Sequence, residues 1–146
     1  MNTWEIIMAN LLRFIRREEN KTFEVFGTEN NENNFVHILS SVIHCSRNSG
    51  IDVSQLLEAV EENYKNKLKD FKNSRNFILF TSALSNNPSM KGKTEFWSAI
   101  EKELVGKIDK FNAIDALTIL YAFSKVKYNT ATNEKLRTVP FILFNF

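Results

Sequence analysis

The stretch DALTILYAFSKVKYNT, residues 115–130, has the pattern of a helix that is apolar over most of its surface. Leu117, Leu120 and Phe123 recur at intervals of three residues, and other apolar residues stand beside them. That spacing favours an α-helix over a strand. A helix with so much apolar surface must be covered by other elements. The fold therefore depends on which other parts of the chain repeat this pattern.

This stretch is the second helix of a predicted helix pair, and a similar pair of predicted helices stands 40 residues earlier in the chain. The first helix of the earlier pair has an apolar stripe formed by Leu56, Val60, Tyr64, Leu68 and Phe71. The matching stripe of the later pair is Phe96, Ile100, Leu104, Ile108 and Phe111. In the second helices, the same shift aligns Phe77, Leu79, Phe80 and Ala83 with Leu117, Ile119, Leu120 and Phe123. Ser54 and Thr94 occupy equivalent positions and are predicted to cap the two first helices, with Asp52 as the alternative cap of the earlier one.

A third copy of the second helix precedes these pairs, at a shift of 81 residues from the last one. Its positions Val36, Ile38, Leu39, Ser41 and Val42 align with Leu117, Ile119, Leu120, Ala122 and Phe123. A period of about 40 residues is typical of solenoids built from two-helix repeats, in which each pair buries its apolar face against its neighbours. The sequence therefore predicts an all-α fold, a short right-handed solenoid of helix-turn-helix repeats with an extra N-terminal helix. Four side chains that repeat in register are expected to be almost fully buried, namely Phe71, Leu79, Leu120 and Phe123.

The remaining segments place this repeat region within a single domain, residues 1–146. A helix is predicted over residues 1–17, because Trp4, Ile7, Met8, Leu11 and Ile15 share one helical face. An Asn-rich loop is predicted over 18–34, the repeats over 35–136, and an apolar C-terminal tail over 137–146.

The stretch DALTILYAFSKVKY resembles the second helix of the repeats in the FAST-kinase-like and RAP-domain group of organelle RNA-associated proteins, including the heptatricopeptide and octotricopeptide types. The matching positions are Asp115, Leu117, Leu120, Ala122, Phe123 and Lys125. The resemblance spans residues 35–136, although Asn76 and Phe77 replace the usual acidic start in the earlier copy. No RAP domain is recognised, so the resemblance transfers no functional residue. It implies helical repeats and an organelle location.

Composition narrows the class of protein. The chain has 146 residues and a net charge of +2, which gives no strong electrostatic attraction to nucleic acid. Cys45 is the only cysteine, which favours a reducing compartment. No apolar run approaches the ~20 residues of a membrane-spanning helix. The N-terminal helix carries Arg13, Arg16 and Arg17 and one acidic residue, Glu5, which is also the pattern of a retained targeting helix, although a helix that packs on the core is the preferred interpretation. The predicted location is mitochondrial, or otherwise cytoplasmic.

The sequence offers little for catalysis, and we predict no catalytic, metal or cofactor site. His37, His44 and Cys45 share one predicted helix, but zinc or Cys–His chemistry needs ligands that converge from more positions. The carboxylates Glu58, Glu61 and Glu62 stand among lysines and are interpreted as a solvated helix face. The protein is therefore predicted not to be an enzyme.

Two binding functions remain open. The first is a non-catalytic scaffold subunit of a larger assembly with other protein subunits, mitochondrial in our interpretation: a respiratory complex, ATP synthase or the ribosome. Its expected partner-binding residues are Trp4, Val139, Phe141, Leu143, Phe144 and Phe146, because large apolar side chains anchor interfaces. The alternative is an organelle RNA-binding repeat protein, whose phosphate contacts would be Lys65, Lys67, Lys69, Lys72 and Arg75.

Overall fold

The computed structural model describes residues 3–17, 29–65, 67–126 and 128, and the secondary structure in these ranges is entirely helical. The all-α prediction is confirmed for this part of the chain. Six α-helices and three short 3₁₀ helices follow one another: α1 (Thr3–Arg17), α2 (Glu29–Ser49), α3 (Ser54–Tyr64), η3 (Leu68–Asp70), α4 (Ser74–Ser85), η4 (Pro88–Met90), α5 (Thr94–Val105), η5 (Ile108–Lys110) and α6 (Ala113–Lys125). None of the described helices is long and apolar enough to cross a membrane.

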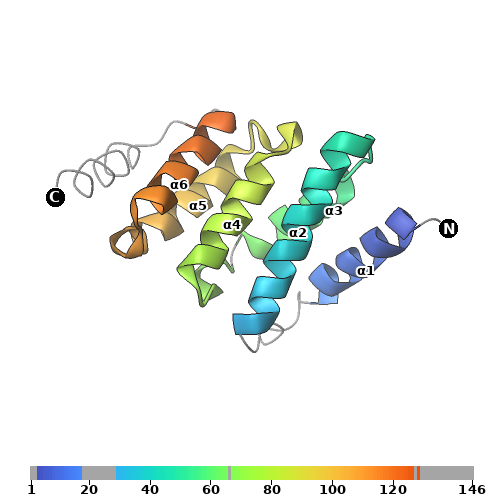
Figure 1. Ribbon diagram of the computed structural model, residues 1–146, viewed down its shortest axis with the longest axis horizontal. Coiled ribbons are helices and arrows are strands. Elements are labelled where there is room, and N and C mark those ends of the chain that lie inside the picture. The colour runs from blue at the N-terminus through green and yellow to red at the C-terminus, as the bar shows by residue number, and fades with distance from the viewer. Residues whose placement is uncertain (1–2, 18–28, 66, 127, 129–146) are drawn as a thin grey trace.

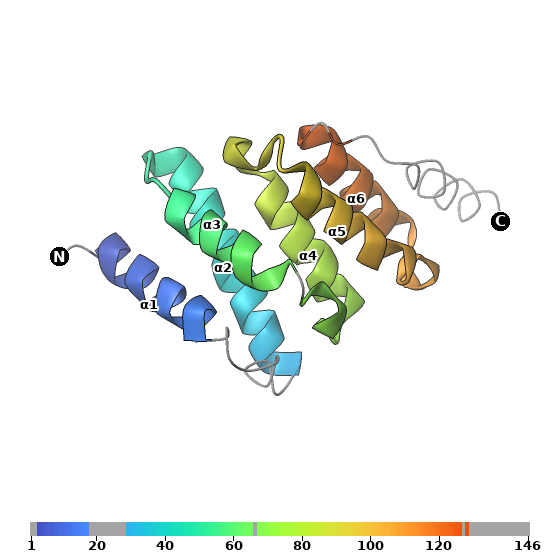
Figure 2. The ribbon, with the colours of Figure 1, turned by 180° about the vertical axis from the view of Figure 1, so that it is seen from behind.

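The α-helices lie in two layers. Helices α2, α4 and α6 lie side by side, in contact from one to the next, and form the layer nearest the viewer in Figure 1. Figure 2, seen from behind, shows α1, α3 and α5 in front, with α1 packed against α3. Each layer covers the apolar faces of the other, so one core runs between them.

The two later helix pairs follow the same order of elements. Helix α3, η3 and α4 correspond to α5, η5 and α6, and their first residues are separated by 40, 40 and 39 positions (94 − 54, 108 − 68 and 113 − 74). The stripes predicted from the sequence for the first helices are buried in both pairs, from Leu56 to Phe71 and from Phe96 to Phe111. The first helices are shorter than expected, because α3 ends at Tyr64 and η3 carries Leu68 of its stripe.

The predicted register of the second helices is wrong by one residue. Phe77 is buried, whereas Leu117, its expected equivalent, is 50% exposed. The N-terminal caps explain the difference: the Asn73 side chain caps α4 and Asn112 caps α6, which is a separation of 39 residues. One residue, Lys72, stands between the end of the buried stripe and Asn73, and the later pair has no equivalent of it.

This register also corrects two burial predictions. Phe71 and Phe123 are buried as expected, but Leu79 and Leu120 are only partly buried at the edge of the core. The predicted caps are wrong as well, because neither Ser54 nor Thr94 caps its helix through a side chain and both are the first residues of their helices.

Helix α2 begins earlier than predicted. The loop expected over 18–34 overlaps α2, which starts at Glu29. A tertiary contact stabilises this polar first turn: Glu32 is fully buried, and its carboxylate accepts hydrogen bonds from the backbone N–H groups of Lys72 (2.8 Å) and Asn73 (3.1 Å). It also accepts one from the side-chain amide of Asn76 (2.9 Å). The carboxylate of Glu32 thus fixes the start of α4, where the N-terminal end of a helix favours negative charge.

Candidate functional site

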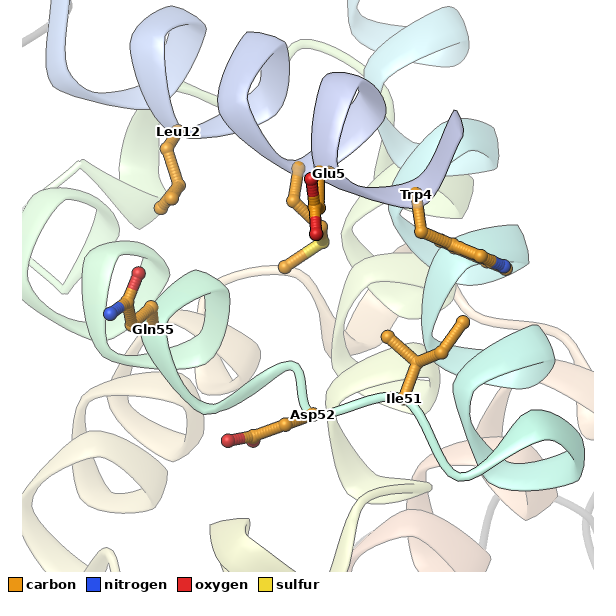
Figure 3. A pocket seen from close by; sticks show the side chains of 7 residues that line it. Trp4, Glu5, Leu12, Ile51, Asp52 and Gln55 are labelled. Atoms are coloured by element: carbon orange, nitrogen blue, oxygen red, sulfur yellow. The ribbon is translucent and has the colours of Figure 1, made fainter. Parts of the chain in front are cut away.

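An open groove of about 380 Å³ lies between α1 and the start of α3. Trp4, Glu5, Met8 and Leu12 of α1 form one wall, and Ile51, Asp52 and Gln55 form the other. Figure 3 shows Trp4 and Leu12 projecting from α1 toward Ile51 and Gln55 across the groove. Trp4, which the sequence singles out as a partner anchor, is therefore half-buried beside a groove and not sealed in the core.

The floor of this groove is apolar and its rim is acidic. Trp4, Met8, Leu12 and Ile51 are all half-buried. The acidic residues Glu5 and Asp52 are exposed on opposite walls. The carboxylate of Asp52 accepts hydrogen bonds from the backbone N–H (2.9 Å) and the hydroxyl group (2.5 Å) of Ser54. These hydrogen bonds lower the pKa of Asp52, so its side chain stays negatively charged at neutral pH.

A second apolar surface lies on α6. Ile114, Leu117 and Tyr121 are 68%, 50% and 65% exposed and recur at helical spacing, so they form one row, which we call the α6 row. At its C-terminal end the ammonium group of Lys125 lies 4.5 Å from the centre of the Tyr121 ring, within range of a cation–π contact. Burial, and then the positive charge of Arg47, lower the pKa of Lys125.

The basic segment considered for RNA binding is partly neutralised. Lys65 pairs with Glu95 at 2.9 Å, and Arg75 lies 3.6 Å from the carboxylate of Asp115. Lys67 is half-buried, while Lys69 and Lys72 are exposed. Lys65 and Arg75 thus have carboxylate partners within the described part of the protein.

The side chains considered for chemistry do not gather into a site. His37, His44 and Cys45 are all exposed on α2, and nowhere in the described ranges do three His, Cys, Asp or Glu residues meet as metal ligands would. Glu61 pairs with Lys93 at 3.2 Å. Glu58 and Glu62 are exposed. The remaining predicted partner anchors lie outside the described residues: Val139, Phe141, Leu143, Phe144 and Phe146.

Three polar residues that organise the structure were missed by reasoning from the sequence. Glu32 joins α2 to α4, and Asn73 and Asn112 cap α4 and α6. A signal for Asn112 was present, because Asn112 and Asp115 have the spacing of a capping box and form one. Glu32 gave no such signal, because it stands within an Asn-rich run that has no apolar period.

No protein-family model matches the chain, and no curated protein or solved structure matches it either. The resemblance to the FAST-kinase-like and RAP-domain group therefore stays a prediction that rests on the residues quoted for it.

Proposed function

We propose that the protein is a non-catalytic, protein-binding scaffold subunit of a larger assembly. Its two layers would form a short right-handed solenoid of helix-turn-helix repeats, a proposal supported by the matching order of elements and burial in the two later pairs. Such folds present extended surfaces to other proteins.

The observation that carries this proposal is the groove beside Trp4. An open groove with an apolar floor and an acidic rim suits a protein segment with apolar side chains flanked by a basic one. Tryptophan is enriched among the residues that dominate binding energy. Four of the seven residues that line the groove are apolar, namely Trp4, Met8, Leu12 and Ile51, and such a lining suits the binding of an apolar protein segment.

We further propose a mitochondrial assembly as the setting, with a respiratory complex, ATP synthase and the ribosome as the candidates. Support comes from the organelle resemblance and from the basic character of α1. Leu11 and Ile15 of this helix are buried against the rest of the protein, and removing α1 would uncover part of α3. The mature protein is therefore expected to keep residues 3–17.

The proposal is tested by photo-crosslinking in cells. A photo-reactive amino acid at Gln55, on the groove wall, should give discrete crosslinks to a protein of the assembly, and the same group at exposed Glu62 on α3 should not. Trp4→Ala should abolish the Gln55 crosslinks. Ile6→Ala is the matched control, because Ile6 is 47% exposed on the same helix and does not line the groove.

Two results would redirect the interpretation. If Gln55 and Glu62 give the same pattern, the groove is not the binding surface. If instead the protein binds single-stranded RNA with a steep salt dependence, and charge reversal of Lys67 and Lys69 removes that binding, the alternative function holds.

A further inference from the structure

Within the described residues, no helix covers α5 and α6 in the way that α6 covers α4 of the preceding pair. Helix α4 is covered by α6, which contributes the Asp115 partner of Arg75 and the Lys125 partner of Asn86. On α4, Ile78 lies between these two contacts and is only 3% exposed. The 39-residue correspondence between α4 and α6 places Ile114, Leu117, Tyr121 and Lys125 at the positions of Arg75, Ile78, Ser82 and Asn86. The α6 row is thus the equivalent of a face that is covered one pair earlier.

Helix α5 shows the same open end in the other layer. At the C-terminal end of α3, Glu61 and the following Lys65 pair with Lys93 (3.2 Å) and Glu95 (2.9 Å) at the start of α5. Forty residues later their equivalents are Glu101 and Val105. Val105 is 49% exposed. One carboxylate oxygen of Glu101 accepts a hydrogen bond from the Tyr128 hydroxyl group (3.2 Å), and the other is buried with no hydrogen-bond partner in the described part of the chain.

We propose that residues 129–146 of the same molecule cap this end face, which consists of the α6 row together with Glu101 and Val105. The charge pattern of the segment fits. Forty residues after Lys93 and Glu95 stand Asn133 and Lys135, followed by Arg137, so the first half of the segment offers hydrogen-bond donors for the buried second oxygen of Glu101. The second half is apolar, with Val139 and then Phe141 to Phe144, and suits the α6 row.

The length of the segment also fits. Helix α6 has 13 residues and is about 20 Å long at 1.5 Å per residue. Ten residues, 129–138, separate Tyr128 from Val139 and span at most about 35 Å when extended. The apolar residues can therefore reach any point of the α6 row. Covering a contiguous apolar row is favourable, and isolated proteins seldom leave such rows open.

This inference concerns a surface at the opposite end of the layers from the Trp4 groove, so it does not depend on the proposed function. The sequence predicts that Val139, Phe141, Leu143, Phe144 and Phe146 anchor a partner protein. In this proposal they pack against the end face of their own molecule instead.

The test is paramagnetic broadening in NMR spectra of the full chain. A spin label on Ser124→Cys, exposed at the end of the α6 row, is placed in a Cys45→Ser background so that it is the only thiol. We expect loss of the amide signals of residues 139–146, and retention of those signals when the label is on Glu62→Cys. Leu117→Glu should restore the signals. Ile38→Glu should not, because Ile38 is equally exposed (47%) but lies on α2.

Three outcomes are distinguished by mixing labelled and unlabelled molecules. Broadening within one molecule, reversed by Leu117→Glu, supports the cap. Broadening only between molecules would show that a second copy occupies the end face. If neither the labelled protein nor the mixture shows broadening, residues 139–146 do not cover the end face, which is then available to a different protein. Either of the last two results overturns the proposal. A spectrum of Leu117→Glu in which the α3 and α4 signals keep their positions shows that the variant is folded.

Discussion

Replacing Glu32 should destabilise the protein although the residue lines neither the Trp4 groove nor the α6 row. The carboxylate is fully buried and accepts three hydrogen bonds that join α2 to the first turn of α4. In Glu32→Gln one oxygen becomes an amide group, so one of the three donors is left facing another donor. An unsatisfied buried donor costs about 1–3 kcal/mol. Since the negative charge at the start of α4 is lost as well, we expect a loss of about 2–4 kcal/mol.

Glu32→Ala should cost more than Glu32→Gln, because it leaves all three donors without their acceptor. The assay is equilibrium unfolding in urea, in which the midpoint falls while the slope stays constant. Glu58→Gln is the matched control, since Glu58 is an exposed glutamate on α3, and such surface changes usually stay within about 0.5 kcal/mol.

Hydrogen exchange locates the effect within the structure. The amides of Lys72 and Asn73 should exchange faster in Glu32→Gln, because these are the two backbone groups that donate to the carboxylate. If Glu32→Gln unfolds at the same urea concentration as Glu58→Gln, or if these two amides keep their protection, the carboxylate does not fix the start of α4 and our explanation of the early start of α2 fails.

Three further predictions follow from the register, the caps and one tyrosine. Leu84→Ala should lower the free energy of unfolding by about 2–5 kcal/mol, because Leu84 is fully buried. Leu79→Ala on the same helix should lower it clearly less in the same urea assay, because Leu79 is only partly buried, and equal losses would contradict the register. Asn112→Ala should cost about 1 kcal/mol through loss of the α6 cap, and exposed Ser124→Ala should cost nothing measurable. Burial raises the pKa of Tyr128 above 10.0, so the stability it adds is complete below pH 10 and is lost as the pH rises through its folded-state pKa. An ultraviolet titration should show Tyr128 ionising late, and Tyr128→Phe should remove that part of the alkaline loss of stability.

The sequence predicts the fold class and the first-helix stripes well, because each stripe is a purely apolar pattern with one period. It fails at the second helices because a cap, and not the apolar pattern, sets their register. The apolar positions of α6 are so numerous that Leu117 and Ala116 are equally plausible partners for Phe77. Only the Asn73 and Asn112 caps decide between them. Helix α2 was predicted too short for a related reason: a polar turn was extended by a tertiary contact from Glu32 that no local pattern records. Trp4 was identified from its residue type alone, and its groove appears only when α1 packs against α3.

The two ends of the layers differ in what they need from outside the molecule. At the C-terminal end the open surface is an apolar row, and the chain itself continues from Tyr128 into a segment that is rich in phenylalanine and long enough to cover that row. At the N-terminal end the groove has an apolar floor, and Glu5 and Asp52 stand at its rim. A basic group binds favourably at an acidic rim, and an apolar segment packs favourably on an apolar row. We therefore expect the C-terminal end to be covered by the chain itself, and we expect a partner protein to bind first at the Trp4 groove.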